Sequence, residues 1–300
     1  MRMREDSEVP RFTPPTPNSR RLGRRLRRLR EERGLTQEEA ARLLACSQGR
    51  IGRIESGDIK PRPRDVLEIL VAYGVPHEQE PGRGLLEMAR QLREPGWWQG
   101  LSTLPNRYIT YMAYEAEAAE LRHFEPMAIP SLMQTRAYAE EINRVGRETE
   151  SELIAHRVEA TALRQEVLTT RRPALRMHAI VTEVALMLRV GGTDVMVEQL
   201  ELVARLAARP NITVQVLRLA AGAHLAVRGG FAILSFDQRD PSLGYIETVA
   251  GELFLESADE VRRLNGAYEG LQALALSPSE SVKFVQTKVL ELSGRHTPIR

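Results

Sequence analysis

Residues 35–57 read LTQEEAARLLACSQGRIGRIESG, and this segment constrains the fold more than any other part of the chain. Thr36 and Glu39 have the spacing of a capping box, which predicts a helix that begins after Thr36 and ends near Leu44. Serine is a preferred N-cap, so a second helix is predicted over Ser47–Glu55, closed by the serine and glycine that follow. Because the turn between them is short, the segment predicts two short helices that cross closely.

The helical pattern extends on both sides of this segment. Residues 20–33 place three leucines at helical spacing among eight arginines, and a further helix is predicted over residues 63–73. We therefore expect an all-helical domain over residues 20–75. The proline-rich residues 1–19 are predicted as a disordered arm, and residues 76–100 as a linker with one docking helix.

Beyond residue 100 the apolar pattern mixes helices with strands. Helical periodicity predicts helices over Tyr111–Phe124, Gln134–Arg144, Glu152–Thr170, Val195–Ala208, Ala258–Ala275 and Ser279–Leu292. Alternating or continuous apolar runs predict strands over Leu175–Val181, Asn211–Leu217, Phe231–Phe236, Tyr245–Val249 and Leu253–Leu255. The predicted fold is mainly α: an N-terminal all-helical domain precedes an α+β C-terminal domain over residues 101–292, with a tail over residues 293–300.

Composition excludes several classes of protein. Apolar residues make up 42% of the chain and charged residues 27%, which is typical of a globular protein. The single cysteine, Cys46, cannot form an internal disulfide. No stretch approaches about 18 consecutive apolar residues, and residues 1–30 lack the apolar run of a signal peptide. We therefore expect a cytoplasmic protein that does not bind a membrane.

The charges are distributed unevenly. Residues 1–75 carry 17 basic and 11 acidic side chains, whereas residues 76–300 carry 25 basic and 29 acidic ones. A basic first quarter is typical of a module that binds a polyanion. The six histidines show no metal-ligand spacing, and neither a Gly-x-Ser-x-Gly nor a Walker sequence occurs. We therefore expect no enzymatic activity, catalytic residue, metal or cofactor.

Several short sequences in the first domain carry a family resemblance: Thr36-Gln37-Glu38, Ser47, Arg53-Ile54-Glu55-x-Gly57 and Lys60-Pro61-x-Pro63. With them, residues 20–75 resemble the Cro/cI-type (XRE) family of helix-turn-helix transcriptional regulators. The resemblance implies that Ser47–Glu55 is a recognition helix that enters the major groove of DNA. Ala45 stands where the family usually has glycine, at a cost of about 1 kcal/mol if its φ is positive. Gly49 and Gly52 each weaken the recognition helix by about 1 kcal/mol relative to alanine, and they either permit a closer approach to the groove or leave this helix ordered only on DNA.

The resemblance implies a set of DNA-binding residues: Gln37, Ser47, Gln48, Gly49, Arg50, Arg53, Lys60, Arg62 and Arg64. Gln48, Gly49 and Arg50 occupy base-facing positions, where the amide of Gln48 suits adenine and the guanidinium of Arg50 suits guanine. Arg53 lies one turn later, within reach of base or phosphate, while Ser47 caps the helix. Gln37 begins the preceding helix and suits phosphate. The three cations after the recognition helix would add affinity that salt weakens.

The second half of the chain carries a separate set of motifs: Trp97-Trp98, Pro130-Ser131-Leu132-Met133-Gln134-Thr135 followed by Tyr138-Ala139, Arg164-Gln165, Glu183-x-x-Leu186, Gly191-Gly192, Pro210–Val216, Gly222-x-His224 and Ala275–Ser281. With these, residues 97–292 resemble the uncharacterised C-terminal domain of actinobacterial XRE-type regulators, which are often described as antitoxin-like. Ser131 stands where this domain usually has glycine, and Arg218 where it usually has proline.

Together these features predict a transcriptional regulator that binds a double-stranded DNA operator as a homodimer. Its C-terminal domain would sense a small-molecule effector or a small protein partner and would mediate oligomerisation. Trp97, Trp98 and His224 are candidate contacts for that effector or partner, with buried packing or an ordinary loop position as the alternatives. The alternative function is an antitoxin-like binding module that sequesters a small protein encoded nearby and binds DNA for autoregulation.

Overall fold

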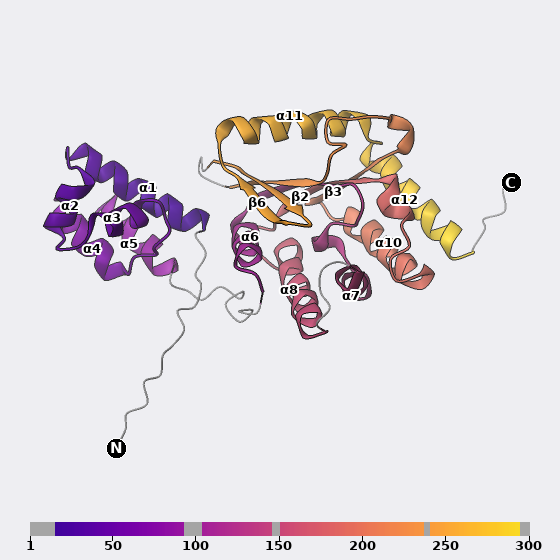
Figure 1. Cartoon of the computed structure of the whole chain (residues 1–300), viewed down its shortest axis with the longest axis horizontal. Helices are drawn as coiled ribbons and strands as arrows, with labels where there is room; N and C mark the ends of the chain where they lie inside the picture. Colours follow the sequence, from indigo (N-terminus) through magenta and orange to yellow (C-terminus); the bar gives the residue numbers. More distant parts are fainter. Residues whose placement is uncertain (1–15, 93–103, 146–150, 237–240, 295–300) are drawn as a thin grey trace, which may run out of the picture. The chain divides into compact units, whose positions relative to one another are not determined.

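The structure, a computed structural model, describes residues 16–92, 104–145, 151–236 and 241–294. Its internal contacts divide the chain into two units, Met1–Glu117 and Ala118–Arg300. The described part of the first unit is helical, and the second combines a six-stranded mixed sheet with helices (Figure 1). The predicted fold class, an all-helical N-terminal domain before an α+β domain, is therefore confirmed.

The first unit contains α1 (Pro17–Glu32), α2 (Gln37–Leu43), α3 (Gln48–Glu55), α4 (Pro63–Ala72), α5 (Gly82–Gln91) and α6 (Asn106–Glu117). Helix α1 begins three residues before its predicted start at Arg20. Thr16 caps it: Thr16 Oγ1 accepts a hydrogen bond from the backbone N–H of Ser19, and Ser19 Oγ accepts one from that of Thr16. Residues 16–19, which the sequence analysis assigned to the disordered arm, instead form the cap and first turn of α1, whereas residues 1–15 lie outside the described residues.

Helices α1 to α5 share one aliphatic core. Its buried members are Leu22, Leu26, Ala40, Ala41, Ile51, Ile54, Val66, Ile69, Leu70, Tyr73, Val75, Leu85, Ala89 and Leu92. Full burial of a leucine or isoleucine side chain contributes about 1.5–3 kcal/mol. The core therefore includes α5, the helix expected to dock from the linker, which packs on α1 and α4.

Helix α1 crosses the C-terminal end of α3 at a glycine. A Cβ atom at Gly23 would lie 2.5 Å from the carbonyl oxygens of both Ile54 and Glu55, so no larger residue fits there. Next to this crossing, Ser19 Oγ donates a hydrogen bond to the carbonyl oxygen of Gly57 at 2.9 Å. The close contact fixes α3, the predicted recognition helix, against α1.

The sheet of the second unit has the strand order β3-β2-β1-β4-β5-β6. Its strands are β1 (Glu120–Glu125), β2 (Arg176–Thr182), β3 (Ile212–Leu217), β4 (Phe231–Ser235), β5 (Leu243–Thr248) and β6 (Gly251–Leu255). The first three are parallel, and β4, β5 and β6 pair antiparallel. The predicted strands are all present within a residue or two, including the final hairpin.

The predicted helix over Tyr111–Phe124 is wrong in its second half. Helix α6 ends at Glu117, and β1 follows as a central strand paired with β2 and β4. Leu121 and Phe124 are both fully buried, and their spacing of three residues also fits one face of a helix. The local pattern of this segment is therefore ambiguous. Its pairing with β2 on one side and β4 on the other stabilises the strand, because it buries the segment in the middle of the sheet.

The helices of the second unit are α7 (Arg136–Val145), α8 (Ser151–Thr169), α9 (Glu183–Met187), α10 (Thr193–Ala207), α11 (Ala258–Leu274) and α12 (Pro278–Leu292). Helix α11 lies on one face of the sheet, and α7, α8 and α10 lie on the other (Figure 1). The helices that connect the parallel strands thus cover the face opposite α11. Among the described residues, no helix combines the length and the apolar character needed to cross a membrane.

The motif at residues 130–135 is held by buried polar side chains. It contains a short 3-10 helix, η2 (Ser131–Met133). The fully buried amide of Gln199, on α10, bridges this segment: its Oε1 accepts from the backbone N–H of Thr135, and its Nε2 donates to the carbonyl oxygen of Met133, both at 2.7 Å. The motif therefore has a structural role in the crossover from β1 to α7.

Both departures from the family pattern in this unit have partners in the fold. Ser131 Oγ accepts a hydrogen bond from Nη2 of the buried Arg164 at 2.9 Å. Arg218 donates through Nε to Glu183 at 2.8 Å and lies 4.5 Å from the centre of the Phe284 ring. Burial opposes the resulting shift, but the hydrogen bonds from Arg218 and the backbone of Leu219 hold the pKa of Glu183 below its usual value.

Replacing Gln199 with leucine should destabilise the second unit. Gln199→Leu keeps most of the side-chain volume but leaves a buried N–H and a buried carbonyl unpaired, at a cost of about 1–3 kcal/mol each. We expect the free energy of unfolding to fall by at least about 2 kcal/mol, measured by urea denaturation of the full chain followed by circular dichroism. Glu198→Leu, on the exposed side of α10, is the matched control; an equal loss in both variants would contradict the structural role of the Gln199 amide.

Candidate nucleic-acid interface

A tight turn joins α2 to α3. The backbone N–H of Cys46 donates to the carbonyl oxygen of Ala41 at 2.9 Å, which closes the end of α2. Ala45 has φ 48°, and it is the only non-glycine residue with positive φ in the described ranges of the chain. Ala45 thus meets the condition stated for it in the sequence analysis, and its left-handed backbone costs about 1 kcal/mol. The half-buried Cys46 packs against the helical core.

Helix α3 has one buried and one exposed face. Ile51 and Ile54 are buried in the core of the first unit. The exposed residues include four of the predicted DNA contacts, Gln48, Gly49, Arg50 and Arg53. Ser47 caps the helix, because its Oγ accepts from the backbone N–H of Arg50 at 3.2 Å. The structure thus brings the predicted base-facing residues together on one accessible surface.

Space around the two glycines of α3 differs. A Cβ at Gly49 would meet no atom within 4 Å, so packing inside the protein does not require glycine there. A Cβ at Gly52 would lie 3.7 Å from Oε1 of Gln37, in ordinary contact with α2. Gly49 therefore leaves a flat, exposed stretch of helix backbone in the middle of the polar face.

A buried ion pair joins α3 to α1 on the side of α3 that faces the core. Arg30 Nε lies 2.6 Å from Glu55 Oε1, and Nη2 lies 3.0 Å from Oε2, so the pair is bidentate. The side chains are only 7% and 5% exposed. Arg30 Nη1 also donates to the carbonyl oxygen of Leu35, and Gln37 Nε2 donates to Glu55 Oε2 at 2.9 Å. These bonds tie α1, α2 and α3 together at one carboxylate.

The hydrogen bonds with Glu55 raise the pKa of Arg30 above its usual value, despite the opposing effect of burial. The guanidinium therefore keeps its charge in a site that water hardly reaches. Sequence reasoning did not assign this role to Arg30 or Glu55. Arg30 continues the four-residue spacing of Leu22 and Leu26 on the apolar face of α1, and a charge at such a position is the signal that points to a buried partner.

Gln37 lies at the first position of α2, half-buried, with its amide nitrogen bound to Glu55. The bond fixes the orientation of the side chain at the helix N-terminus; contact with phosphate stays a prediction. At the cap before it, Glu39 accepts hydrogen bonds from the backbone N–H and the hydroxyl of Thr36. These bonds hold the pKa of Glu39 below its usual value.

The three predicted phosphate contacts after α3 differ in exposure. Arg62 and Arg64 are exposed, and Arg64 pairs with Glu68 at 3.1 Å on the surface of α4. Lys60 is half-buried, and burial lowers the pKa of its ammonium below the usual value. The two arginines are therefore more accessible to a ligand than the lysine.

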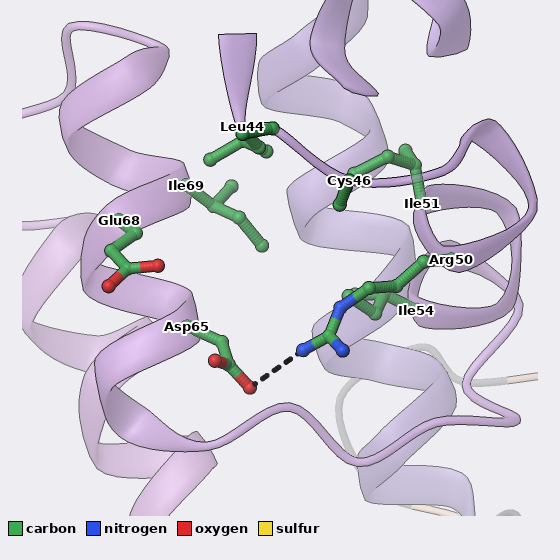
Figure 2. Close-up of a pocket in the computed structure, with 9 residues that line it drawn as sticks. Leu44, Cys46, Arg50, Ile51, Ile54, Asp65, Glu68 and Ile69 are labelled. Carbon is green, nitrogen blue, oxygen red and sulfur yellow. Dashed lines mark hydrogen bonds and ion pairs between the residues drawn. The ribbon is translucent and has the colours of Figure 1, made fainter. Parts of the chain in front are cut away.

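A pocket separates the turn and α3 from α4 (Figure 2). Its apolar residues are Leu44, Ala45, Cys46, Ile51, Ile54 and Ile69, and its polar ones are Arg50, Asp65 and Glu68. Arg50 extends toward α4, where Nη2 lies 3.3 Å from Asp65 Oδ2. The guanidinium predicted to read guanine is therefore paired with a carboxylate that the sequence analysis did not single out.

Of the three candidate contacts for an effector or partner, the structure describes only His224. Trp97 and Trp98 lie outside the described residues. His224 is half-buried, with its ring edge-on to Phe124 at 5.6 Å, and its Nδ1 has no hydrogen-bond partner among the residues that the structure describes. Over the same residues, no three histidine, cysteine or acidic side chains form a group suited to a metal ion. A ligand contact by His224 stays a prediction.

Breaking the buried ion pair should destabilise the first unit. Glu55→Gln removes the charge that compensates Arg30, and loss of one partner of a buried pair costs about 3–5 kcal/mol. We expect hydrogen exchange of the α1–α3 amides in the full chain to show this loss. Glu32→Gln, which removes an exposed carboxylate paired with Arg28 at 2.9 Å, should change the exchange little. Equal effects of the two changes would contradict the supporting role of Glu55.

Comparison with known protein families gives two matches. Residues 21–81 match a helix-turn-helix domain, and residues 108–287 match a domain of unknown function, DUF5753. Comparison with curated proteins and with solved structures gives no match. The first match covers most of α1 and all of α2 to α4, and it identifies the fold around α3 as a helix-turn-helix domain, which suggests a DNA-binding regulator. The second covers more than half of the chain, which therefore belongs to the family defined by the DUF5753 domain and carries a helix-turn-helix domain before it.

Proposed function

We propose that the chain is a sequence-specific, DNA-binding transcriptional regulator of the XRE type, in which α3 reads the major groove. The observation that carries the proposal is the exposed polar face of α3, held by a buried ion pair between Glu55 and α1. A recognition helix needs a rigid support, because base readout depends on fixed donor and acceptor positions. The helix-turn-helix match over residues 21–81 supports the same proposal.

The side chains at the N-terminal end of α3 suit base edges. Gln48 is the first residue of the helix and is exposed, so its amide can pair with N6 and N7 of adenine. Arg50 can pair with O6 and N7 of guanine through two N–H groups. Gly49, between them, allows the helix backbone to approach the groove without a side chain in the way.

Phosphate contacts would position the helix. The candidate phosphate contacts lie on α3 and on the helices next to it: Gln37 at the start of α2, Arg53 one turn after Arg50 on α3, and the exposed Arg62 and Arg64 at the start of α4. Lys60 joins this set as a weaker contributor, because it is half-buried. Such contacts release counterions from DNA, so the affinity should fall as the salt concentration rises.

Within this proposal the protein acts in the cytoplasm as a homodimer, since two helices of this length would read two half-sites about 34 Å apart. The second unit would bind an effector or a small protein, as the antitoxin-like alternative also requires. Large apolar side chains are exposed in the segments that follow the parallel strands: Met127 after β1, Met187 and Leu188 at the end of the helix α9 that follows β2, and Leu219 after β3. The carboxyl edge of parallel strands is a common place for ligands in open sheets, which supports this assignment.

The first test replaces the two proposed base readers. In footprinting and binding assays on the DNA upstream of the gene, Gln48→Ala with Arg50→Ala should lose about 1–3 kcal/mol per base contact. Affinity for a random duplex should change little after Gln48→Ala. Arg64→Ala is the control, because a phosphate contact contributes equally on both duplexes.

Protection of a two-fold symmetric site by the wild-type chain would support both the reading helix and the dimer. A wild-type chain that binds all duplexes equally, or a double variant that keeps the full preference for the operator, would contradict readout by α3. Protection of a single half-site would contradict the homodimer alone.

Gly49→Ala should separate stability from DNA binding. Alanine at this helical position raises helix stability by about 1 kcal/mol, and no atom of the protein stands in its way. The added methyl group would occupy the surface that faces the groove, so we expect weaker binding to the operator. Gly266→Ala, at another helical glycine with open space around its Cβ, should add stability without changing DNA binding. Operator affinity that stays unchanged after Gly49→Ala would contradict close approach at Gly49.

A further inference from the structure

Asp65 stands where α3 and α4 meet, beside the guanidinium of Arg50. Oδ2 of Asp65 lies 3.3 Å from Nη2 of Arg50, across the pocket between the two helices (Figure 2). The side chain of Arg50 is 45% exposed, whereas that of Asp65 is 26% exposed. The arginine is therefore accessible to a ligand while its partner is largely covered.

The carboxylate of Asp65 is anchored by its own helix. Oδ2 also accepts a hydrogen bond from the backbone N–H of Arg62 at 2.9 Å, as the third residue of a capped helix that begins with Pro63. Helix α4 is fixed in turn by Val66 and Ile69, which are buried in the core. A fixed acceptor gives the flexible side chain of Arg50 a preferred position.

One contact with a carboxylate leaves most of the guanidinium free. The group carries five N–H donors in a planar fork, and guanine uses two of them. An arginine that has no carboxylate beside it also pairs well with DNA phosphates, and contacts with phosphates carry no sequence information. A carboxylate next to Arg50 opposes that second use, because it offsets the charge of the guanidinium and repels nearby phosphates.

We propose that Asp65 determines sequence specificity by holding Arg50 in the position that reads a base and by disfavouring its contact with phosphate. Asp65 is thus a positioning residue that acts through Arg50. The inference rests on the proposed function, since it requires α3 to face DNA.

The pocket itself offers the matched control. Glu68 lies one turn after Asp65 on α4 and also lines the pocket, but its carboxylate pairs with the exposed Arg64 at 3.1 Å. Asp65→Asn and Glu68→Gln each remove one negative charge from the same helix. The asparagine side chain keeps an oxygen that can accept the hydrogen bond from Arg62, so Asp65→Asn should leave α4 folded, which circular dichroism and the melting temperature of the full chain check.

The experiment first selects preferred duplexes from a random pool with the wild-type chain. It then compares the affinity of each variant for the selected duplex and for a scrambled one. We expect Asp65→Asn to lower the ratio of the two affinities about tenfold, through weaker binding to the selected duplex and stronger binding to the scrambled one. Glu68→Gln should leave the ratio within about twofold of wild type, since its carboxylate has no contact with Arg50.

A double-mutant cycle with Arg50→Ala shows whether Asp65 acts through Arg50. Once Arg50 is absent, Asp65→Asn should no longer change the ratio. A ratio that stays the same or rises in Asp65→Asn, that falls equally in Glu68→Gln, or that still falls without Arg50 would overturn the role of Asp65. A wild-type chain that selects no preferred duplex would overturn the proposed function itself, and the inference with it.

Discussion

The bidentate ion pair between Arg30 and Glu55 is the interaction on which the proposed DNA-reading surface, the exposed face of α3, depends. It joins α1 to the last residue of α3, and Gln37 adds α2 to the same carboxylate. A buried pair of this kind contributes little net stability compared with apolar packing, but it is costly to break and permits few alternative geometries. The ion pair therefore fixes the orientation of α3 relative to α1. Gly23 allows the backbones of the two helices to come into contact where they cross. This orientation also determines which residues of α3 are exposed, because its two isoleucines are buried in the core on the opposite face.

The second unit relies on the same kind of constraint without charge. Gln199 pairs a buried N–H and a buried carbonyl of the segment before α7. Asn211 has a related role after α8, where its Nδ2 donates to two carbonyl oxygens, those of Leu168 and Leu175. Backbone that leaves a helix or strand inside the fold must find partners, and an amide side chain can supply them from a neighbouring element. Several motif residues of the C-terminal domain are thus explained by folding alone, and the chemistry of any ligand must come from other residues.

Sequence reasoning predicted local structure better than contacts between distant residues. The capping box before α2, the short turn between α2 and α3, and most helices and strands follow from short-range spacing. The failure at β1 has a clear cause, since Leu121 and Phe124 fit either a helix face or a central strand until β2 and β4 are in place. The position of α3 and its exposed residues were predictable because the resemblance to helix-turn-helix regulators supplied the motif. The contacts that support α3 could not be predicted, because Arg30, Glu55 and Asp65 have partners 15 to 25 residues away in the sequence. The first domain also contains many arginines, and nothing in its composition distinguishes the one that is buried.

Helix α3, the proposed recognition helix, has little helical stability of its own, and this affects how it would work. Eight residues with two internal glycines, preceded by a left-handed alanine, would not form a stable helix in water. Contacts outside the helix must supply what propensity lacks: the serine cap, the two buried isoleucines, Glu55 on Arg30, and Asp65 beside Arg50. A helix held in this way has its backbone fixed by other elements, while its exposed positions remain free of packing constraints. If α3 reads DNA as proposed, residues on that face can be substituted to suit a different DNA sequence without disturbing the fold.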